Sequence, residues 1–152
     1  MLYHGDYTEV SNPNILIEGY TKDFGYGFYL TESKKQAEQW AKRKGKDKGV
    51  VSVFDYEPDS SLSMKVFNKV DFDWVEFIAL CRSGKSHNYD IVEGPVADDT
   101  IYNFVNSYLE GSLSKKEFKT LCEFREPTHQ IVFCSPLSIR KCLKFKYSYE
   151  VI

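Results

Sequence analysis

The chain has 152 residues, of which 42% are hydrophobic and 28% charged, and its formal net charge is −2. This length supports one hydrophobic core, so we expect a single domain over residues 1–152. The near-neutral charge gives no global electrostatic case for nucleic-acid binding, and no stretch approaches the 18 apolar residues of a membrane-spanning helix. The 11 Phe and 11 Tyr residues favour a β-containing protein, since broad side chains pack well on pleated sheets.

Two segments depart from the balanced charge. Residues 34–48 carry seven basic side chains against only Glu38 and Asp47, and a second cluster near the C-terminus contains Arg140, Lys141, Lys144 and Lys146. Basic runs are commonly solvated faces of a protein.

The cysteines indicate the compartment. Cys81, Cys122, Cys134 and Cys142 have no CxxC spacing. The absence of this spacing disfavours a metal site, and we expect free buried thiols in a reducing compartment instead. Because the N-terminus also lacks a secretory signal pattern, we expect a cytoplasmic protein.

The first half of the chain predicts mostly strands. In chain order, we expect a strand over 1–5, a short helix or turn over 15–19, a strand over 24–31, a helix from 32 or 33 onward, a turn over 45–49, a strand over 50–56 and a weaker strand over 62–67. The strand over 24–31 alternates aromatic residues with glycines, which suits close approach of a ligand. Thr31 is a suitable N-cap for the next helix, on which Ala37, Trp40 and Ala41 share one apolar face.

The second half predicts helices between shorter strands. We expect a helix over 71–81, a strand over 89–92 closed by a Gly-Pro turn, helices over 97–109 and 115–124, a strand over 130–134, a short helix over 136–141 and a strand over 143–152. Ser114 and Glu117 form the pattern of a capping box before the 115–124 helix. Because strands and helices mix without regular βαβ alternation, we expect an α+β fold.

Three segments in a particular order carry the functional interpretation. Leu-Tyr-His-Gly occupies residues 2–5, Gly-Tyr-Gly-Phe-Tyr-Leu-Thr occupies 25–31, and a helix over 32–41 follows. This order resembles the His-Tyr-Glu class of ADP-ribosyltransferases, which includes the poly(ADP-ribose) polymerases and diphtheria toxin. The chain is closer still to a bacterial family with the same transferase-like core, through residues 23–31, 94–99 and 130–133. That resemblance covers residues 2 to about 145.

The resemblance implies an ADP-ribosyltransferase-like split β-sheet core with peripheral helices, and NAD as co-substrate. It implies that His4, Tyr29 and Gln130 form the catalytic set. The residues that it implies for NAD contact are His4, Gly5, Tyr26, Gly27, Tyr29, Thr31, Arg82 and Asp99. For Arg82 two roles stay open, because its guanidinium is a suitable partner for either the NAD pyrophosphate or Asp90.

These residue types suit cleavage of NAD, which passes through a transition state with oxocarbenium character. His4 can bind a ribose hydroxyl through one ring nitrogen while the protein orients the other. Gly5 has no Cβ to block approach of the nicotinamide amide to its backbone. By resemblance Tyr29 offers a face to the nicotinamide ring, with Tyr26 or an aromatic residue of the following helix opposite it. Core packing is the alternative role of Tyr29.

Gln130 departs from the enzyme pattern, which has a glutamate at this position. A glutamine can bind a ribose hydroxyl but supplies no negative charge to the developing cation, and losing such a contact costs about 2.7–4 kcal/mol in a catalytic step. Three outcomes stay open: slow transfer, a replacement carboxylate, or NAD binding without transfer. The candidate replacements are Glu126, Asp98 and Asp99, although an aspartate at a helix start is commonly an N-cap.

We therefore expect an NAD-dependent mono-ADP-ribosyltransferase that releases nicotinamide and modifies a protein or a nucleic acid. A bacterial toxin or phage-defence effector, with an antitoxin partner and no membrane association, fits this activity. The basic run over 34–48 favours a nucleic-acid acceptor, since phosphate contacts need such residues. The alternative is a catalytically weak module that binds NAD or ADP-ribose and acts by interaction, which Gln130 favours. A plain structural domain is the third interpretation.

Overall fold

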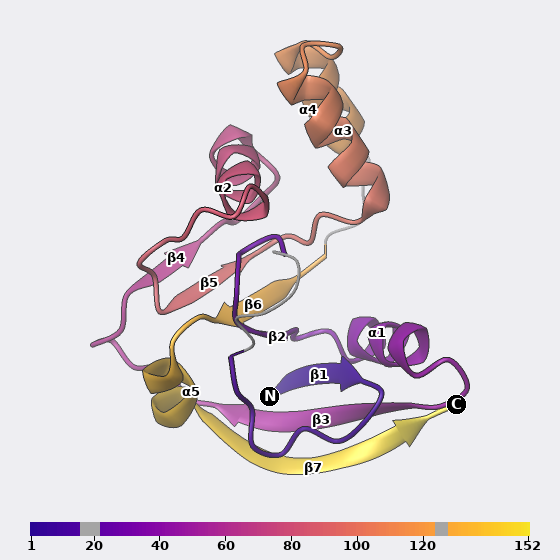
Figure 1. The fold of residues 1–152 in the computed structure, drawn as a ribbon, viewed down its shortest axis with the longest axis vertical. Coiled ribbons are helices and arrows are strands. Elements are labelled where there is room, and N and C mark those ends of the chain that lie inside the picture. Colours follow the sequence, from indigo (N-terminus) through magenta and orange to yellow (C-terminus); the bar gives the residue numbers. More distant parts are fainter. Residues whose placement is uncertain (16–21, 124–127) are drawn as a thin grey trace.

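The computed structural model describes residues 1–15, 22–123 and 128–152. Within these ranges the predicted α+β class is confirmed, with two sheets and five helices (Figure 1). The strands are β1 (Leu2–Asp6), β2 (Phe28–Leu30), β3 (Gly49–Tyr56), β4 (Met64–Val66), β5 (Ile91–Gly94), β6 (Gln130–Phe133) and β7 (Leu143–Val151). The helices are α1 (Lys34–Gly45), α2 (Phe72–Arg82), α3 (Asp99–Leu109), α4 (Lys115–Glu123) and α5 (Pro136–Cys142).

One sheet has three antiparallel strands in the order β1-β3-β7. Helix α1 packs on this sheet through Ala37 and Ala41, which join Val51 and Val53 in one buried cluster. The helix lies very close to β1, because a Cβ atom at Gly5 would come within 2.1 Å of the carbonyl oxygen of Ala37. Helix packing therefore requires a glycine at this position.

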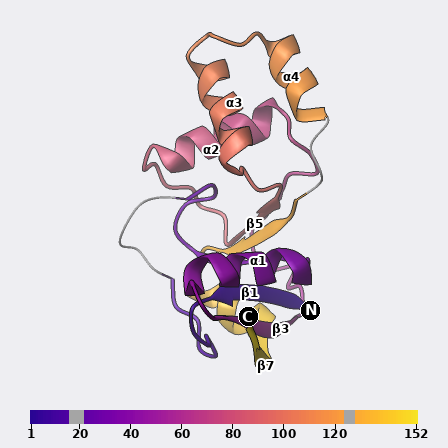
Figure 2. The ribbon, with the colours of Figure 1, turned by 90° about the vertical axis from the view of Figure 1, so that its right-hand side faces the viewer.

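The other sheet has four strands in the order β2-β6-β5-β4, of which only the β4–β5 pair is parallel. Both sheets contribute to one core cluster, with Leu2 and Phe54 from the first sheet and Phe28 and Ile131 from the second. A second cluster joins the four-stranded sheet to α2, α3 and α4, which Figure 2 shows gathered at the end of the molecule away from β7. Its members include Trp74, Ile78, Val92, Ile101, Val105, Phe118 and Val132.

The strands β1 and β2 join the two sheets through one bridge. Tyr3 and Thr31 exchange two backbone hydrogen bonds of 2.9 Å each. The His4 side chain adds a contact across the same junction, to the carbonyl oxygen of Tyr29, which lies 25 residues further along the chain. The bridge therefore holds the strand of His4 beside the strand of Tyr29.

Two predictions around β2 are wrong. The strand spans only Phe28–Leu30 and not residues 24–31, because Gly25 turns the chain with a φ of +81°. Thr31 is not the N-cap of α1: its hydroxyl is fully buried and accepts the N–H of Ser33. Ser33 is the cap, since its Oγ accepts the N–H of Gln36.

Most other boundaries lie within a few residues of the predicted ones. The capping box of α4 is confirmed, because the N–H of Glu117 donates to Ser114 Oγ at 3.1 Å and the N–H of Ser114 donates to Glu117 Oε1 at 3.3 Å. The predicted turn over 15–19, apart from its first residue, and Glu126 lie outside the described residues.

Within the described ranges no helix is both long and apolar enough to cross a membrane.

Candidate functional site

A cavity of about 320 Å³ lies where β1, β2 and β6 meet the helices α1 and α2. His4 and Gly5 of β1 line it together with Tyr29 of β2, Arg82 of α2 and Gln130 of β6. These five are predicted site residues, and they come from widely separated parts of the chain. The fold thus brings the three predicted catalytic residues into one cavity.

His4 is held through both ring nitrogens. Nδ1 donates to the carbonyl oxygen of Tyr29 at 2.6 Å, and Nε2 lies 3.3 Å from Oδ2 of Asp6. Burial raises the pKa of the Asp6 carboxyl, but the hydrogen bond from His4, the charge of Lys44 and the N–H of Tyr7 outweigh it and lower the pKa to about 2. Asp6 is therefore a carboxylate at neutral pH, and the position of Nε2 is set by Asp6 and by the Nδ1 contact.

Tyr29 contributes to the core and to the cavity. Its hydroxyl donates to the carbonyl oxygen of Gly25 at 2.6 Å and accepts the N–H of Phe24 at 3.1 Å. Burial raises the pKa of this hydroxyl well above its ordinary value, so it is not an acid–base group at neutral pH. Lys22, another cavity residue, places its Nζ 5.0 Å from the centre of the Tyr29 ring. This cation–π contact marks the ring face that is turned toward the cavity.

Gln130 has an amide orientation that its neighbours determine. The side chain is 3% exposed, and Nε2 donates to Oδ2 of Asp23 at 3.1 Å and to the carbonyl oxygen of Pro95 at 3.0 Å. Both partners only accept hydrogen bonds, so the amide nitrogen has to face them. The amide oxygen Oε1 is left as the group that can meet a ligand.

Asp23 is the cavity carboxylate that the sequence interpretation missed. It is buried, and its two oxygens accept hydrogen bonds from the Arg82 side chain, the N–H of Ala97 and Gln130. The sequence signal was weak: Asp23 opens the Asp-Phe-Gly-Tyr-Gly segment, but no local spacing places it beside a residue 107 positions later.

Arg82 pairs with Asp23 in the structure. Its Nε donates to Oδ1 of Asp23 at 2.9 Å and Nη2 donates to the same oxygen, while its guanidinium lies 3.7 Å from the centre of the Tyr102 ring. Asp90 instead accepts hydrogen bonds from Ser63. The predicted alternative of an Arg82–Asp90 pair is therefore wrong.

Trp40 and several basic residues complete the lining of the 320 Å³ cavity. Trp40, predicted on the apolar face of α1, is only half-buried and lines the cavity, so it is the aromatic residue of that helix that can lie opposite Tyr29. Four cationic side chains line the described part of the cavity, against the single carboxylate of Asp23. They are Lys22, Arg43, Lys44 and Arg82. Two of these charges are partly neutralised, since Arg82 pairs with Asp23 and Lys44 lies 3.6 Å from Asp6, but the sum still favours an anionic ligand.

Four residues predicted to contact NAD do not line the cavity. Tyr26 is 40% exposed, Asp99 is exposed in the first turn of α3, and Thr31 is buried at the sheet junction. At Gly27 a Cβ atom would come within 2.5 Å of the Val132 side chain, so packing against β6 accounts for this glycine.

Neither Asp98 nor Asp99, the two described candidates to replace the missing glutamate, lines the cavity of His4. Asp98 is the N-cap of α3, with Oδ1 accepting the N–H of Ile101 at 2.8 Å. Asp98 also lines a larger cavity of about 580 Å³ that is bordered by Phe72 and Phe118. None of the predicted catalytic residues lines this larger cavity.

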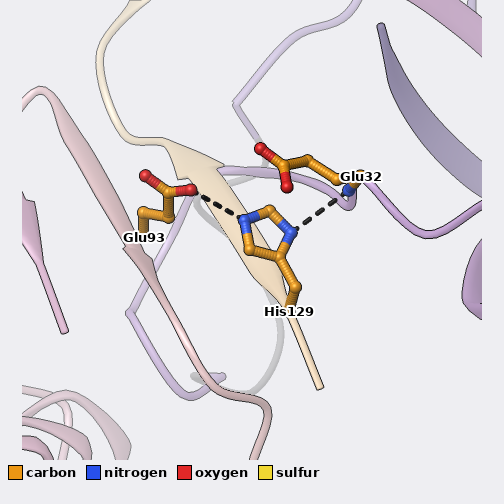
Figure 3. Close-up of side chains that lie close together, drawn as sticks. All are labelled: Glu32, Glu93 and His129. Carbon is orange, nitrogen blue, oxygen red and sulfur yellow. Dashed lines mark hydrogen bonds and ion pairs between the residues drawn. The ribbon is translucent and has the colours of Figure 1, made fainter. Parts of the chain in front are cut away.

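Glu32, Glu93 and His129 form a polar cluster at the head of β6 (Figure 3), where one ligand atom of each lies within 4.8 Å of the others. His129 Nδ1 accepts the N–H of Glu32 at 3.1 Å, so Nε2 carries the proton and donates to Glu93 at 2.8 Å. A metal ion would have to displace this proton to bind Nε2. In the structure the cluster is a hydrogen-bonded clamp, and Gln36 strengthens it by donating to the carbonyl oxygen of His129 at 2.7 Å.

No disulfide joins any two of Cys81, Cys122, Cys134 and Cys142. Burial raises the pKa of the Cys81 and Cys134 thiols to about 12, so neither is a thiolate at neutral pH. Cys81 and Cys142 are fully buried, whereas Cys122 and Cys134 are half-buried. Cys81 and Cys134 are thus poor nucleophiles.

Fold and cavity together define an α+β protein whose two sheets meet at a bridge, with a basic cavity beside the bridge. The chain belongs to the family described as "Protein of unknown function (DUF3990)", which it matches over residues 1–145. No curated protein and no solved structure matches the chain.

Proposed function

We propose that this protein binds NAD in the cavity beside the β1–β2 bridge and transfers ADP-ribose to a macromolecular acceptor, on an ADP-ribosyltransferase-like core. The observation that carries the proposal is the meeting of His4, Tyr29 and Gln130 in one cavity of about 320 Å³. These residues come from three strands, and their order along the chain resembles that of the His-Tyr-Glu transferases. Because no local interaction requires them to meet, their proximity supports that resemblance.

The cavity suits one half of NAD in size and charge. Ligand cavities of this order hold small molecules, so the nicotinamide riboside half fits inside while the rest of the dinucleotide extends from the mouth. Arg43 and Lys44, which lie in the last turn of α1, give that region positive charge. An anionic pyrophosphate is stabilised by such side chains.

The proposed reaction breaks the bond between the ribose C1′ and the nicotinamide nitrogen, and the electron pair leaves with neutral nicotinamide. Tyr29 and Trp40 offer aromatic faces to the nicotinamide ring. One ribose hydroxyl shares Nε2 of His4 with the Asp6 carboxylate, and another donates to Oε1 of Gln130. The nucleophile of the acceptor then bonds to C1′ and gives its proton to solvent.

A second function, binding of NAD or ADP-ribose without transfer, is favoured because the Asp23 carboxylate in the cavity is neutralised by Arg82. Gln130 is neutral and the Asp23 carboxylate is paired with Arg82. Among the described lining residues, therefore, no unpaired carboxylate faces the developing cation. Such a site is suited to binding NAD or ADP-ribose without transfer.

The test is incubation of the protein with NAD labelled in its adenosine phosphate, in separate mixtures with cell lysate, RNA and DNA. Label on a macromolecule supports the transferase. Nicotinamide release without such label indicates a glycohydrolase, and saturable NAD binding without either product supports the binding module. Absence of NAD binding contradicts all three.

Two variants control this experiment. His4→Ala is expected to weaken NAD binding and reduce every product, because it removes the proposed ribose contact of Nε2, and thermal unfolding of the variant checks that it folds without the Nδ1 contact. Tyr26→Ala is the matched control, since Tyr26 is exposed and outside the cavity, and it should behave as the unmodified protein.

A further inference from the structure

We infer that Asp23 is a positioning residue that makes Gln130 an obligatory hydrogen-bond acceptor for a ribose hydroxyl of NAD. The inference rests on the proposed function and assigns a role to a residue that lies outside the predicted set of site residues. It concerns one question: which end of the Gln130 amide meets the ligand.

An amide can present either its donor or its acceptor to a hydroxyl group. At Gln130 both N–H groups are used, one on Oδ2 of Asp23 at 3.1 Å and one on the carbonyl oxygen of Pro95 at 3.0 Å. Rotating the amide by half a turn would place Oε1 against two acceptors in a buried site, which is unfavourable. Oε1 is therefore the end that a ligand meets, and a ribose hydroxyl has to donate to it.

Asp23 can fix the orientation of the Gln130 amide because other hydrogen bonds fix the Asp23 carboxylate. Arg82 donates to Oδ1 from Nε, at 2.9 Å, and from Nη2, and the N–H of Ala97 donates to Oδ2 at 2.8 Å. The Tyr102 ring supports the guanidinium of Arg82 from α3. The carboxylate also polarises the amide of Gln130, which increases the negative charge on Oε1. A neutral glutamine thereby gains part of the acceptor character of a glutamate.

The arrangement has a consequence for substitution at position 130. Gln130→Glu would place a second carboxylate about 3 Å from Asp23, where like charges in a buried site repel. Restoring the residue that the transferases carry should therefore damage this protein. Neutralising Asp23 at the same time should relieve the repulsion.

The experiment compares the unmodified protein with Asp23→Asn, Gln130→Glu and the double variant, with Asp99→Asn as an exposed control. Thermal unfolding gives the melting temperature. Isothermal calorimetry gives the affinity for NAD and for analogues that lack the 2′ or the 3′ hydroxyl of the nicotinamide ribose. If Asp23→Asn does not fold, Arg82→Lys replaces it, since a lysine cannot hold Asp23 at two points.

We expect the unmodified protein to prefer NAD over one deoxy analogue by about tenfold, the loss typical of an unpaired buried acceptor. Asp23→Asn should lose most of this preference, since its own amide can donate to Gln130 and allow Oε1 to turn away. Gln130→Glu should lower both the melting temperature and the affinity for NAD, and the double variant should recover part of each.

Two results would overturn the inference. One is an Asp23→Asn protein with a lower melting temperature but an unchanged preference for NAD, since a purely structural aspartate would behave in this way. The other is a Gln130→Glu protein that is as stable and binds as tightly as the unmodified one. If the unmodified protein binds no NAD, the proposed function fails, and the Asp23–Gln130 contact is then judged by stability alone. A double variant less stable than both single variants contradicts that contact.

Discussion

The imidazole of His4 donates a hydrogen bond of 2.6 Å to the main-chain carbonyl of Tyr29. This contact crosses the junction between the two sheets, so it stabilises the fold whether or not a ligand is bound. Nδ1 makes this structural contact, while Nε2 lies 3.3 Å from Oδ2 of Asp6 and is the nitrogen that we propose for a ribose hydroxyl. Tyr29 divides its roles in a similar way, with a hydroxyl bonded to the chain and a ring beside the cavity. Substitutions can separate these roles.

Replacing His4 by phenylalanine should cost stability as well as binding. The new ring can keep the contact with Phe28, whose ring centre lies 4.4 Å from that of His4, but the carbonyl of Tyr29 loses its donor. An unsatisfied buried acceptor costs about 1–3 kcal/mol, which urea unfolding of the His4→Phe protein would measure. A variant as stable as the unmodified protein would show that the junction does not depend on this bond.

Tyr29→Phe should affect stability far more than ligand binding. It keeps the aromatic face but removes the hydroxyl contacts with Phe24 and Gly25, so we expect a loss of about 1–2 kcal/mol in unfolding free energy. The comparison is Tyr29→Leu, which also removes the stacking face and should weaken NAD binding by about fivefold more than Tyr29→Phe. Calorimetric titration with NAD distinguishes the two. Equal affinities for NAD in both variants would show that the Tyr29 ring does not contact NAD.

Asp6 should make stability depend on pH in the acid range. Its pKa falls from 3.8 to about 2 in the folded protein. Because the folded-state pKa is the lower one, the stabilisation is complete above the unfolded value and disappears as the pH falls toward 2. We expect Asp6→Asn to cost about 1–2 kcal/mol at pH 7 and almost nothing near pH 2. Urea unfolding of both proteins across this range is the measurement, and a difference that does not change with pH would contradict it.

Gly5→Ala should destabilise the protein by about 3 kcal/mol or more, because the new Cβ would lie 2.1 Å from the carbonyl oxygen of Ala37 and 2.8 Å from the nitrogen of Ala41. Both are main-chain atoms, so α1 would have to move. Gly45→Ala is the matched control, since its nearest neighbour is 3.9 Å away and it ends the same helix. It should be neutral or stabilising by up to about 1 kcal/mol. Similar losses in both variants, measured by thermal unfolding, would refute the packing explanation.

Elements with a local cause could be predicted well from the sequence. The capping box at Ser114 and Glu117 involves residues three apart, and the α2 helix begins where Asp71 accepts the N–H of Trp74 at 2.9 Å. The errors around β2 are also local but depend on backbone conformation. Gly25 can continue a strand or turn it, because a glycine has no Cβ to restrict φ.

The sequence by itself determined the order of strands and helices and the α+β class, since periodicity and capping are properties of neighbouring residues, and its resemblance to the transferases supplied the candidates His4, Tyr29 and Gln130. Only the tertiary structure decided that these candidates share a cavity and that Asp23 lies beside Gln130. Strand order places β2 next to β6, and the packing of α2 brings Arg82 to the same carboxylate. Such contacts join residues far apart in the chain, and they form only when both sheets and the helix adopt their final positions.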